Sequence, residues 1–455
     1  MYQRIRLFFT VFLLTLLCVV PVSANSAIKS WSGSDGNGVY TMEEDCPVVC
    51  LKEDLIFDIG SFPLDYFGSV EELSAYDASV TAVYTLNNPT ESQISVRLVF
   101  PFGEDPQYFY HSSIGEELGD YRILVNDEAI EKKIRYSLMT GSDFDVETDV
   151  SRLRDEYQTD AFYRSDLPVY EYVFETQGIE NGENGNPECV LQLQIDPSRQ
   201  RLVTGECNYF HSDDDGNYEI HCYADGNNQE YRMYVLGEDL KELPEFTVMV
   251  LDGEETSGEM LLKEKNETVL LELILSQKKY ENISDIDWYN ACIDYLKEKD
   301  PYLYDAIPFV QVYYRLLRWY EYELNFEAGE TLTNSVKAPI YPDINGYYEP
   351  AVYTYRYLLS PASTWADFSD LDITVNTAYA MIENSSFEEK EGKYTLHYDR
   401  LPEGELSFRL SESPSPKHGS DKTFYIIVGI LAGALMIFLL LAVALIKLIR
   451  KLIHK

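Results

Sequence analysis

The feature that most constrains this chain is an uncharged, apolar run of 24 residues near the C-terminal end, "TFYIIVGILAGALMIFLLLAVALI" (423–446). An α-helix needs roughly 20 such residues to cross the hydrocarbon core of a bilayer. The run is followed by "KLIRKLIHK" (447–455), and basic flanks are typical of the cytoplasmic side. We therefore expect one transmembrane helix at 423–446, a cytoplasmic tail at 447–455, and a chain that is extracytoplasmic before the membrane.

The other end of the chain agrees with export. Residues 1–24 contain two arginines, then an apolar run, then small residues, which is the pattern of a secretory signal peptide. The chain is thus expected to be a single-pass protein of the cell membrane. Inside the expected helix, Gly429 and Gly433 have the GxxxG spacing that lets two spanning helices approach closely. Glycine is also common in spanning helices generally, so helix dimerisation stays one of two interpretations.

The charge of the expected exported part limits its partners. The chain has 77 acidic and 36 basic side chains, and six of the basic ones lie in the leader and the tail. Such a surface repels nucleic acid and anionic lipid and attracts cations or basic partners. We expect contact with the membrane through the spanning helix, no nucleic-acid partner, and a protein, glycan or cation as ligand.

Period-two patterns dominate the exported part. "ASVTAVYTLNNPTESQISVRLVFPF" (78–102) alternates apolar and polar residues on both sides of Asn88-Pro89, which predicts a strand, a turn and a strand. Residues 122–137 predict a hairpin that turns at Asn126-Asp127. A short helix is expected near 146–158 because apolar residues recur there at helical spacing.

The pattern changes at residue 284. Ser284 can cap a helix that continues through "DIDWYNACIDYLKEKD", and "PFVQVYYRLLRWYEYELNF" predicts a second helix from Pro308. Period-two segments return from 326. The expected fold is mainly β, α+β overall: a β-sandwich-like ectodomain with a helical insertion. The expected parts are a β-rich region 25–283, a helical segment 284–325, a β-sandwich-like domain 326–410 and a Ser/Pro-rich stem 411–422.

One short stretch, "CNYFHSDDDGNYEIHC" (207–222), has the residue types of a chemical site. A turn centred on Asp214 and Asp215 predicts a hairpin that sends His211 and His221 to opposite faces. Zinc is therefore not expected, because its ligands must converge on one point. Asp213 and Asp215 are candidates for calcium binding, and no other cofactor is expected. The preferred interpretation is that Asp and Gly are good turn-forming residues.

The same register predicts disulfide bonds. Cys207 falls opposite Cys222, and a second predicted hairpin places Cys189 opposite Cys207. Opposed strand residues have Cα separations within the disulfide range. An even number of cysteines after the leader also favours disulfides in an exported chain. The candidates are Cys207 with either Cys222 or Cys189, and Cys46 and Cys50.

The sequence contains no motif of a known catalytic site. HExxH, GxSxG, Walker and Rossmann patterns are absent, so we expect no catalytic residues and no enzyme. A membrane-anchored hydrolase of glycans or peptides stays an alternative, because glycoside hydrolysis needs only two suitably spaced carboxylates. Signalling through a partner membrane protein is another. Asn266, Asn282 and Asn384 match the glycosylation pattern, which also arises by chance.

Two segments carry a resemblance to known proteins. "YTLNNPTESQISVRLVFPFG" (84–103) and "VYTYRYLLSPASTWADFSDLDITVN" (352–376) resemble uncharacterised bacterial membrane-anchored surface proteins of domain-of-unknown-function type. The first segment is also similar to the VIT-type β-domain, in which a strand ending in Phe-Pro follows an Asn-containing turn. The resemblance implies a signal, a β-rich ectodomain and one C-terminal spanning helix, and no activity. The expected function is that of a membrane-anchored extracytoplasmic binding or structural surface protein.

Overall fold

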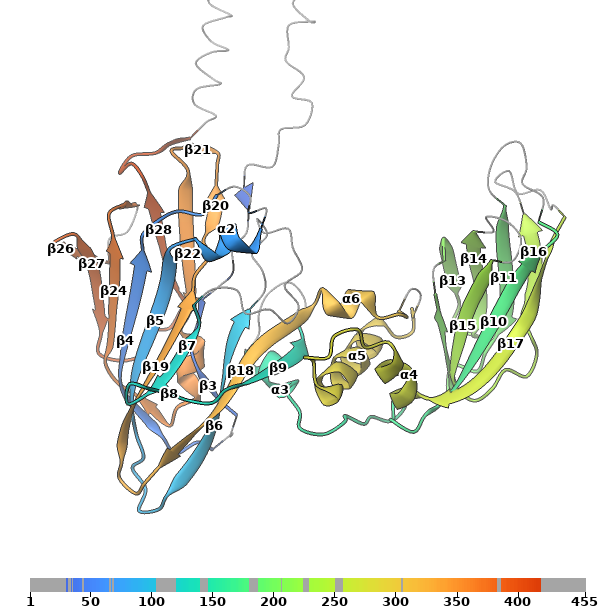
Figure 1. Ribbon diagram of the computed structural model, residues 1–455, viewed down its shortest axis with the longest axis horizontal. Helices are drawn as coiled ribbons and strands as arrows, with labels where there is room; N and C mark the ends of the chain where they lie inside the picture. The colour runs from blue at the N-terminus through green and yellow to red at the C-terminus, as the bar shows by residue number, and fades with distance from the viewer. Residues whose placement is uncertain are drawn as a thin grey trace, which may run out of the picture.

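The computed structural model describes most of the chain between residues 30 and 418. The described residues are 30–31, 34, 36–42, 45–64, 67, 69–103, 120–139, 146–179, 187–205, 207–223, 229–249, 257–303, 306–382 and 386–418. Within them the fold is mainly β, as expected. Figure 1 shows two blocks of strands at opposite ends of the long axis, joined by a group of helices. We call these the terminal sandwich (30–139 and 316–418), the helical module (270–315) and the inserted sandwich (168–269).

The terminal sandwich is built on one large sheet, in the order β26-β27-β24-β4-β5-β19-β7-β8, with β23 beside β4. In β5, every second residue is buried, which confirms the strand predicted from its alternation. Asn126 and Asp127 both have positive φ and join β7 to β8, which confirms the predicted tight turn. The strands are β4 Val49–Ile59, β5 Ala78–Asn87, β7 Arg122–Val125, β8 Glu128–Ala129, β19 Thr331–Pro339, β23 Asp367–Phe368, β24 Leu371–Thr377, β26 Glu388–Lys390 and β27 Lys393–Tyr398.

Two smaller sheets cover the buried face of the large one. Their orders are β1-β20-β22-β28-β25, with β2 beside β22, and β3-β6-β18-β9. Phe57 of the large sheet, Phe408 and Tyr320 belong to one hydrophobic core between the three sheets. The elements are β1 Ser30–Trp31, β2 Gly36–Asn37, β3 Tyr40–Thr41, β6 Ile94–Gly103, β9 Lys133–Leu138, β18 Leu316–Phe326, β20 Asp343–Asn345, β22 Val352–Leu358, β25 Ala380–Ile382 and β28 Leu406–Ser411, with α2 Val70–Ser74, η1 Ser360–Thr364 and the pair β21 Tyr348–Glu349 and β29 Lys417–His418.

The inserted sandwich consists of two packed sheets. One has the order β12-β15-β10-β17 and the other β13-β14-β11-β16. Phe174 and Met233 of the first sheet pack with Leu191 and Ile220 of the second. The strands are β10 Pro168–Gln177, β11 Glu188–Gln194, β12 Gln200–Thr204, β13 Tyr209–Ser212, β14 Asn217–Tyr223, β15 Glu230–Gly237, β16 Glu245–Met249 and β17 Glu259–Val269.

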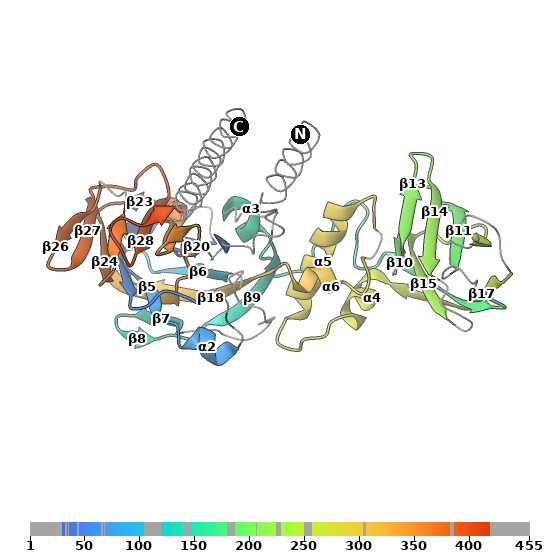
Figure 2. The ribbon, with the colours of Figure 1, turned by 90° about the horizontal axis from the view of Figure 1, so that it is seen from above.

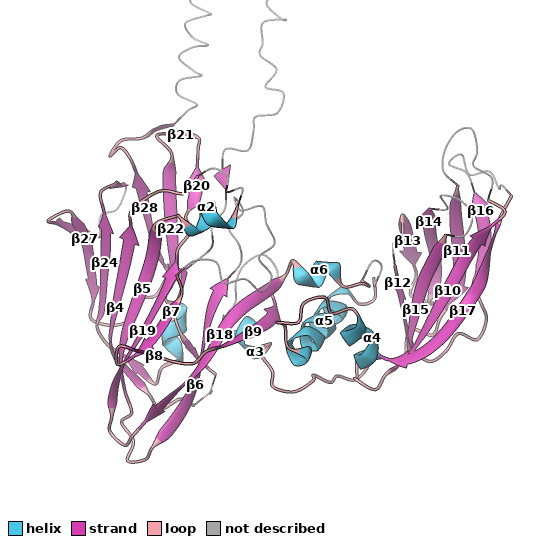
Figure 3. Cartoon of the chain, viewed as in Figure 1, coloured by secondary structure: helices cyan, strands magenta, loops and turns pink. Residues whose placement is uncertain are grey.

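The helical module lies between the sandwiches in both ribbon views (Figures 2 and 3). Its helices are α4 Leu270–Ser276, α5 Asp285–Lys299 and α6 Val310–Tyr313, and α3 Val146–Ser151 precedes it in the chain. The Ser284 hydroxyl accepts a hydrogen bond from the Asp287 N–H at 3.0 Å, which confirms the predicted cap of α5. Trp288 of α5 packs in one core with Val169 and Leu236, which lie on the outer face of the β12-β15-β10-β17 sheet.

Buried ion pairs join the helical module to the terminal sandwich. Arg135 of β9 is 1% exposed, and its Nε donates to the Asp287 carboxylate at 3.0 Å. Its Nη1 donates to Glu321 of β18 and to Asp155 at 3.1 Å. At the other end of the module, Arg201 of β12 donates to Asp300 at 2.7 Å. The module is therefore fastened to both sandwiches by charge-assisted hydrogen bonds.

The predicted second helix is wrong. Residues 316–326 form β18, which pairs with β6 and β9, and only Val310–Tyr313 of the predicted segment is helical. Tyr320, Tyr322 and Leu324 recur with period two and lie in the core of the terminal sandwich. Aromatic residues favour a half-buried position in a sheet. The sequence of this segment fits both a helix and a strand, and pairing with β6 on one edge and β9 on the other makes it a strand. The predicted helix near 146–158 is present, but it ends at Ser151.

The expected division into parts also differs from the structure. β24 pairs in parallel with β4, and β19 pairs with β5, so segments from 25–283 and 326–410 form one sandwich. Residues 168–269 form a separate one. The first residues of the expected stem belong to the fold, because Ser411 is buried and β29 pairs with β21. Periodicity identifies strands, but it does not identify the partner of a strand that is distant in sequence.

No helix among the described residues is long and apolar enough to span a membrane. The expected signal peptide 1–24, the run 423–446 with Gly429 and Gly433, the tail 447–455 and Asn384 lie outside the described residues.

Candidate ligand-binding groove

The stretch 207–222 forms a hairpin, but its register differs from the prediction by one residue. Tyr209 pairs with His221 and His211 with Glu219. The Asp213 N–H donates to the Asn217 carbonyl at 3.2 Å, so the loop holds three residues, with Gly216 at φ +80°. A turn of this kind places a glycine in the left-handed position as a bulge. The prediction assumed a loop centred on Asp214 and Asp215 and missed this bulge.

The corrected register changes which side chains of the hairpin lie on its outer face. A shift of one residue exchanges the two faces of a strand. Phe210 and Ile220 now point into the core, whereas His211, Glu219 and His221 share the outer face. The prediction that the histidines lie on opposite faces is wrong. This stretch therefore gathers two imidazoles and a carboxylate on one surface of the inserted sandwich.

The carboxylate of Asp213, one of the two calcium candidates, is engaged in the turn. Oδ1 of Asp213 accepts from the N–H groups of Asp215 and Asn217 at 3.0 and 2.9 Å, and Oδ2 accepts from the Asn217 amide at 2.8 Å. The amide hydrogen bond of Asn217 is the largest cause that lowers the pKa of the Asp213 carboxyl. These contacts are those of a turn-forming aspartate. Calcium binding at Asp213 and Asp215 stays a prediction.

The cysteines meet in a different pairing from the one predicted. Cys189 of β11 lies directly opposite Cys222 of β14, and the Cys222 thiol donates to the Cys189 carbonyl at 3.4 Å. Cys207 was expected opposite both, but β12 and β11 lie in different sheets. Burial raises the pKa of the Cys189 thiol to about 11. Cys46 and Cys50 are buried in the terminal sandwich, and no disulfide joins any of the described cysteines.

His221 is held between two carboxylates. Its Nδ1 lies 3.1 Å from Glu188 Oε2, and its Nε2 lies 3.2 Å from Glu219 Oε1. The Gln192 amide donates to the other oxygen of Glu219 at 2.9 Å. The hydrogen bond from His221 is the largest cause that lowers the pKa of Glu219. Because both ring nitrogens are occupied, His221 acts here as a fixed part of the surface.

A groove of about 620 Å³ runs along this outer face. Strands β11, β13, β14 and β16 form its floor, and the inserted sandwich to which they belong lies at the opposite end of the long axis from the terminal sandwich (Figure 1). The segment 241–243 forms one side. Four carboxylates and three amides face one lysine, so the lining is polar and acidic. The charged and amide residues are Gln192, Gln194, His211, Asp213, Asn217, Glu219, Lys241, Glu242 and Glu245.

A second cavity of about 560 Å³ lies where the inserted sandwich meets the helical module. Its basic side chain, Arg232, is already paired with Glu171 at 2.9 Å and Glu230 at 3.0 Å. These groups neutralise one another. In the groove, by contrast, no ion pair joins Lys241 to Glu242 or Glu245 within the described residues. The groove therefore has more uncompensated charge with which to bind a ligand.

Sequence reasoning found only part of the groove. It singled out His211 and Asp213, which line the groove, and His221, which lies beside it on β14. It missed Gln192 and Glu245, which lie on β11 and β16. The alternating polar residues of "CVLQLQI" signal an exposed face, but nothing local indicates that β14 and β16 flank that strand.

No family model and no curated protein matches this chain. A solved structure that is similar to part of it is the "putative nutrient binding protein" from Legionella pneumophila. That likeness has 9% sequence identity and a TM-score of 0.32, and covers 84% of this chain and 72% of the other. A TM-score of this size does not establish a common fold, and it carries no conclusion about function.

Proposed function

We propose that this protein is a membrane-anchored extracytoplasmic binding protein, and that the groove of the inserted sandwich binds a small cationic ligand rich in hydrogen-bond donors. The observation that carries the proposal is the lining of that groove. Glu242 and Glu245 supply acceptors and negative charge, and Asp213 and Glu219, whose oxygens already accept hydrogen bonds, add negative charge, against one lysine. A polyamine or a short lysine-rich peptide has the complementary chemistry.

The shape and lining both support a polar ligand. The volume of about 620 Å³ falls within the usual range for small-molecule sites. Such sites are mostly apolar when they hold drug-like or lipid ligands. Here most lining residues are polar, beside Leu193, Tyr218 and Leu243, and many of the polar atoms, those of Gln192, Gln194, Glu219 and Glu245 among them, are presented by neighbouring strands. Strand-borne groups keep their positions, so little ordering is needed on binding.

The charge of the whole chain supports attraction of cations over a longer range. The formal net charge is −41. A surface of one sign raises the local concentration of oppositely charged ligands and the rate at which they associate. Salt screens this attraction with a Debye length of about 8 Å at physiological ionic strength. We therefore expect binding to weaken as salt is raised.

The membrane anchor belongs to the same proposal and rests on the sequence of 423–446. The fold is compatible with it, since the chain enters and leaves the terminal sandwich at one place. β1 at residue 30 pairs with β20, and β29 at residue 418 pairs with β21, a few residues further along. An anchor after residue 418 would hold the terminal sandwich and leave the groove, at the other end of the molecule, accessible.

Calorimetric titration of the purified full-length chain tests the ligand class. Spermidine is the cationic probe, and glucose is the neutral one. We expect saturable binding of spermidine, and at least roughly fivefold weaker binding for Glu245→Gln, since one charge about 6 Å away contributes about 1 kcal/mol. The matched control is Glu389→Gln, an exposed glutamate of the terminal sandwich. An equal loss of spermidine affinity in both variants, or no binding of spermidine to the wild type, would contradict the proposal.

A further inference from the structure

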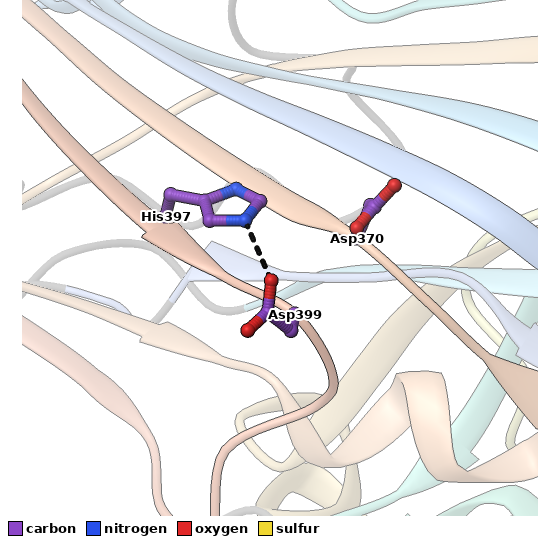
Figure 4. Close-up of side chains that lie close together, drawn as sticks. All are labelled: Asp370, His397 and Asp399. Carbon is purple, nitrogen blue, oxygen red and sulfur yellow. Dashed lines mark hydrogen bonds and ion pairs between the residues drawn. The ribbon is translucent and has the colours of Figure 1, made fainter.

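The terminal sandwich carries a second polar cluster, on the exposed face where β24 and β27 meet. Asp370, His397 and Asp399 each place one ligand-type atom within 4.8 Å of the other two (Figure 4). All three residues are exposed. This is the one group among the described residues in which three such side chains converge. It is separate from the groove and lies at the other end of the molecule.

Strand pairing brings these residues together. β24 and β27 are antiparallel, with Leu371 opposite Tyr398 and Asp372 opposite His397. Asp370 precedes β24 and Asp399 follows β27, so both come to the same end of the ladder. The carbonyl of Asp370 accepts from the Glu53 N–H at 2.9 Å, which fixes the backbone at the start of β24.

The imidazole of His397 is oriented as in known metal sites. Its Nδ1 lies 2.8 Å from Asp372 Oδ1, and its Nε2 points toward Asp399, 3.2 Å away. Lys52 holds the other oxygen of Asp372 at 3.0 Å. A histidine that binds a metal through one nitrogen almost always donates the other N–H to a carboxylate, which fixes its tautomer and direction.

Ion pairing alone accounts for only part of this arrangement. A protonated His397 between Asp372 and Asp399 would be a satisfied surface group. However, a carboxylate oxygen of Asp370 also lies within 4.8 Å of the Asp399 and His397 ligand atoms, and that carboxylate has no hydrogen-bond or ion-pair partner among the described residues. A cation bound among the three groups would offset the negative charge of the two carboxylates. Ion pairing of His397 therefore does not explain why Asp370 lies at this cluster.

We propose that Asp370, His397 and Asp399 form a binding site for a divalent transition-metal ion of the zinc type. His397 Nε2 and one oxygen from each aspartate are the ligands, and Asp372 is a positioning residue. One imidazole with carboxylates suits such ions, whereas calcium prefers six to eight oxygens. Ligand distances of about 2.0–2.2 Å require the atoms to close to about 3.4 Å in a tetrahedron. The exposed side chains can rotate that far, and water completes the coordination.

Titration of the purified full-length chain with ZnCl₂ tests this site. We expect one zinc ion whose affinity falls at least tenfold in His397→Gln, Asp399→Asn and Asp370→Asn. Asp372→Asn should weaken binding roughly 10- to 100-fold, as outer carboxylates do. The matched controls are Asp58→Asn, an exposed aspartate of the same sheet, and His418→Gln. Both controls should bind as the wild type does.

A second measurement locates the ion. Co²⁺ in place of Zn²⁺ gives a visible absorption spectrum that reports its ligands, and His397→Gln should change that spectrum. If the three ligand variants bind zinc as tightly as the wild type, the proposal is wrong. It is equally wrong if Asp58→Asn and His418→Gln weaken binding as much as the ligand variants do.

Discussion

At the scale of single residues, the least expected group is the carboxyl of Glu53. It lies on β4, is 1% exposed, and faces the core of the terminal sandwich beside Tyr84 and Tyr357. Its Oε1 has no hydrogen-bond partner among the described residues. Burial raises the pKa of Glu53 to about 8, and the hydrogen bond with Tyr84 opposes that shift. The side chain is therefore a neutral acid at neutral pH.

This residue predicts how stability changes with pH. Because the pKa is higher in the folded than in the unfolded chain, unfolding releases a proton between pH 4.5 and about 8. The free energy of unfolding should therefore fall across that interval, by up to an amount on the order of 5 kcal/mol for this group. Above about pH 8 the contribution of the protonated form is lost.

Urea unfolding at about pH 5 and about pH 9 measures this effect. Glu53→Gln keeps the shape of the side chain but does not titrate, so its stability should fall less between the two pH values. Many surface acids change stability in the opposite sense, so the difference between the wild type and the variant is the quantity to compare. Parallel pH profiles for the two proteins would show that Glu53 is not the source.

At the scale of elements, local pattern and tertiary pairing account for different parts of the fold. Alternation correctly predicted β5, and the Ser284 cap correctly predicted the start of α5. The same reasoning failed for β18, because "LLRWYEYELNF" fits both a helical and a period-two pattern. It also failed for the hairpin at 207–222, where Gly216 adds one residue to the loop.

The candidate groove was accessible to sequence reasoning only in part, for the same reason. Glu219 and His221 lie on one strand, and their shared face follows from local alternation. Gln192 and Glu245 reach the groove only because β11 pairs with β14 on one edge and β16 on the other. Which strands pair depends on which apolar faces are buried together in the folded chain. This cannot be deduced from the sequence of one strand alone.

The corrected strand order yields a specific disulfide prediction. Cα atoms of directly opposed strand residues lie about 4.5 or 5.5 Å apart, within the range that a disulfide spans. If the chain is exported to an oxidising compartment, as proposed, we expect Cys189 and Cys222 to be linked. Peptide mapping by mass spectrometry without reduction checks this. Finding Cys207 linked to either residue instead would contradict the observed register.

At the scale of the whole molecule, the helical module and the inserted sandwich form one long insertion between two strands of the terminal sandwich. These strands, β9 and β18, are neighbours in one sheet, and the Met139 N–H donates to the Arg315 carbonyl at 2.8 Å where the insertion begins and ends. Arg135, on β9, fastens the module at this base through Asp287 and Glu321. The position of the groove therefore depends on this joint.

Removing Arg135 should weaken the molecule at that joint. Arg135→Ala leaves Asp287, which is 2% exposed, without its cation, and uncompensated buried charges cost about 3–5 kcal/mol. The matched control is Arg232→Ala, whose side chain is 47% exposed and whose ion pairs should contribute less than about 1 kcal/mol each. Urea unfolding of both variants gives the comparison. A similar decrease in the free energy of unfolding in the two variants would contradict the role assigned to Arg135.

The central claim is that the groove of the inserted sandwich binds a cationic ligand, and hydrogen–deuterium exchange tests it most directly. The full-length chain is compared with and without saturating spermidine. We predict slower exchange in peptides that cover β11, β14 and β16, and no change in those that cover β24 and β27. Protection confined to the terminal sandwich, or protection nowhere in the chain, would contradict the claim.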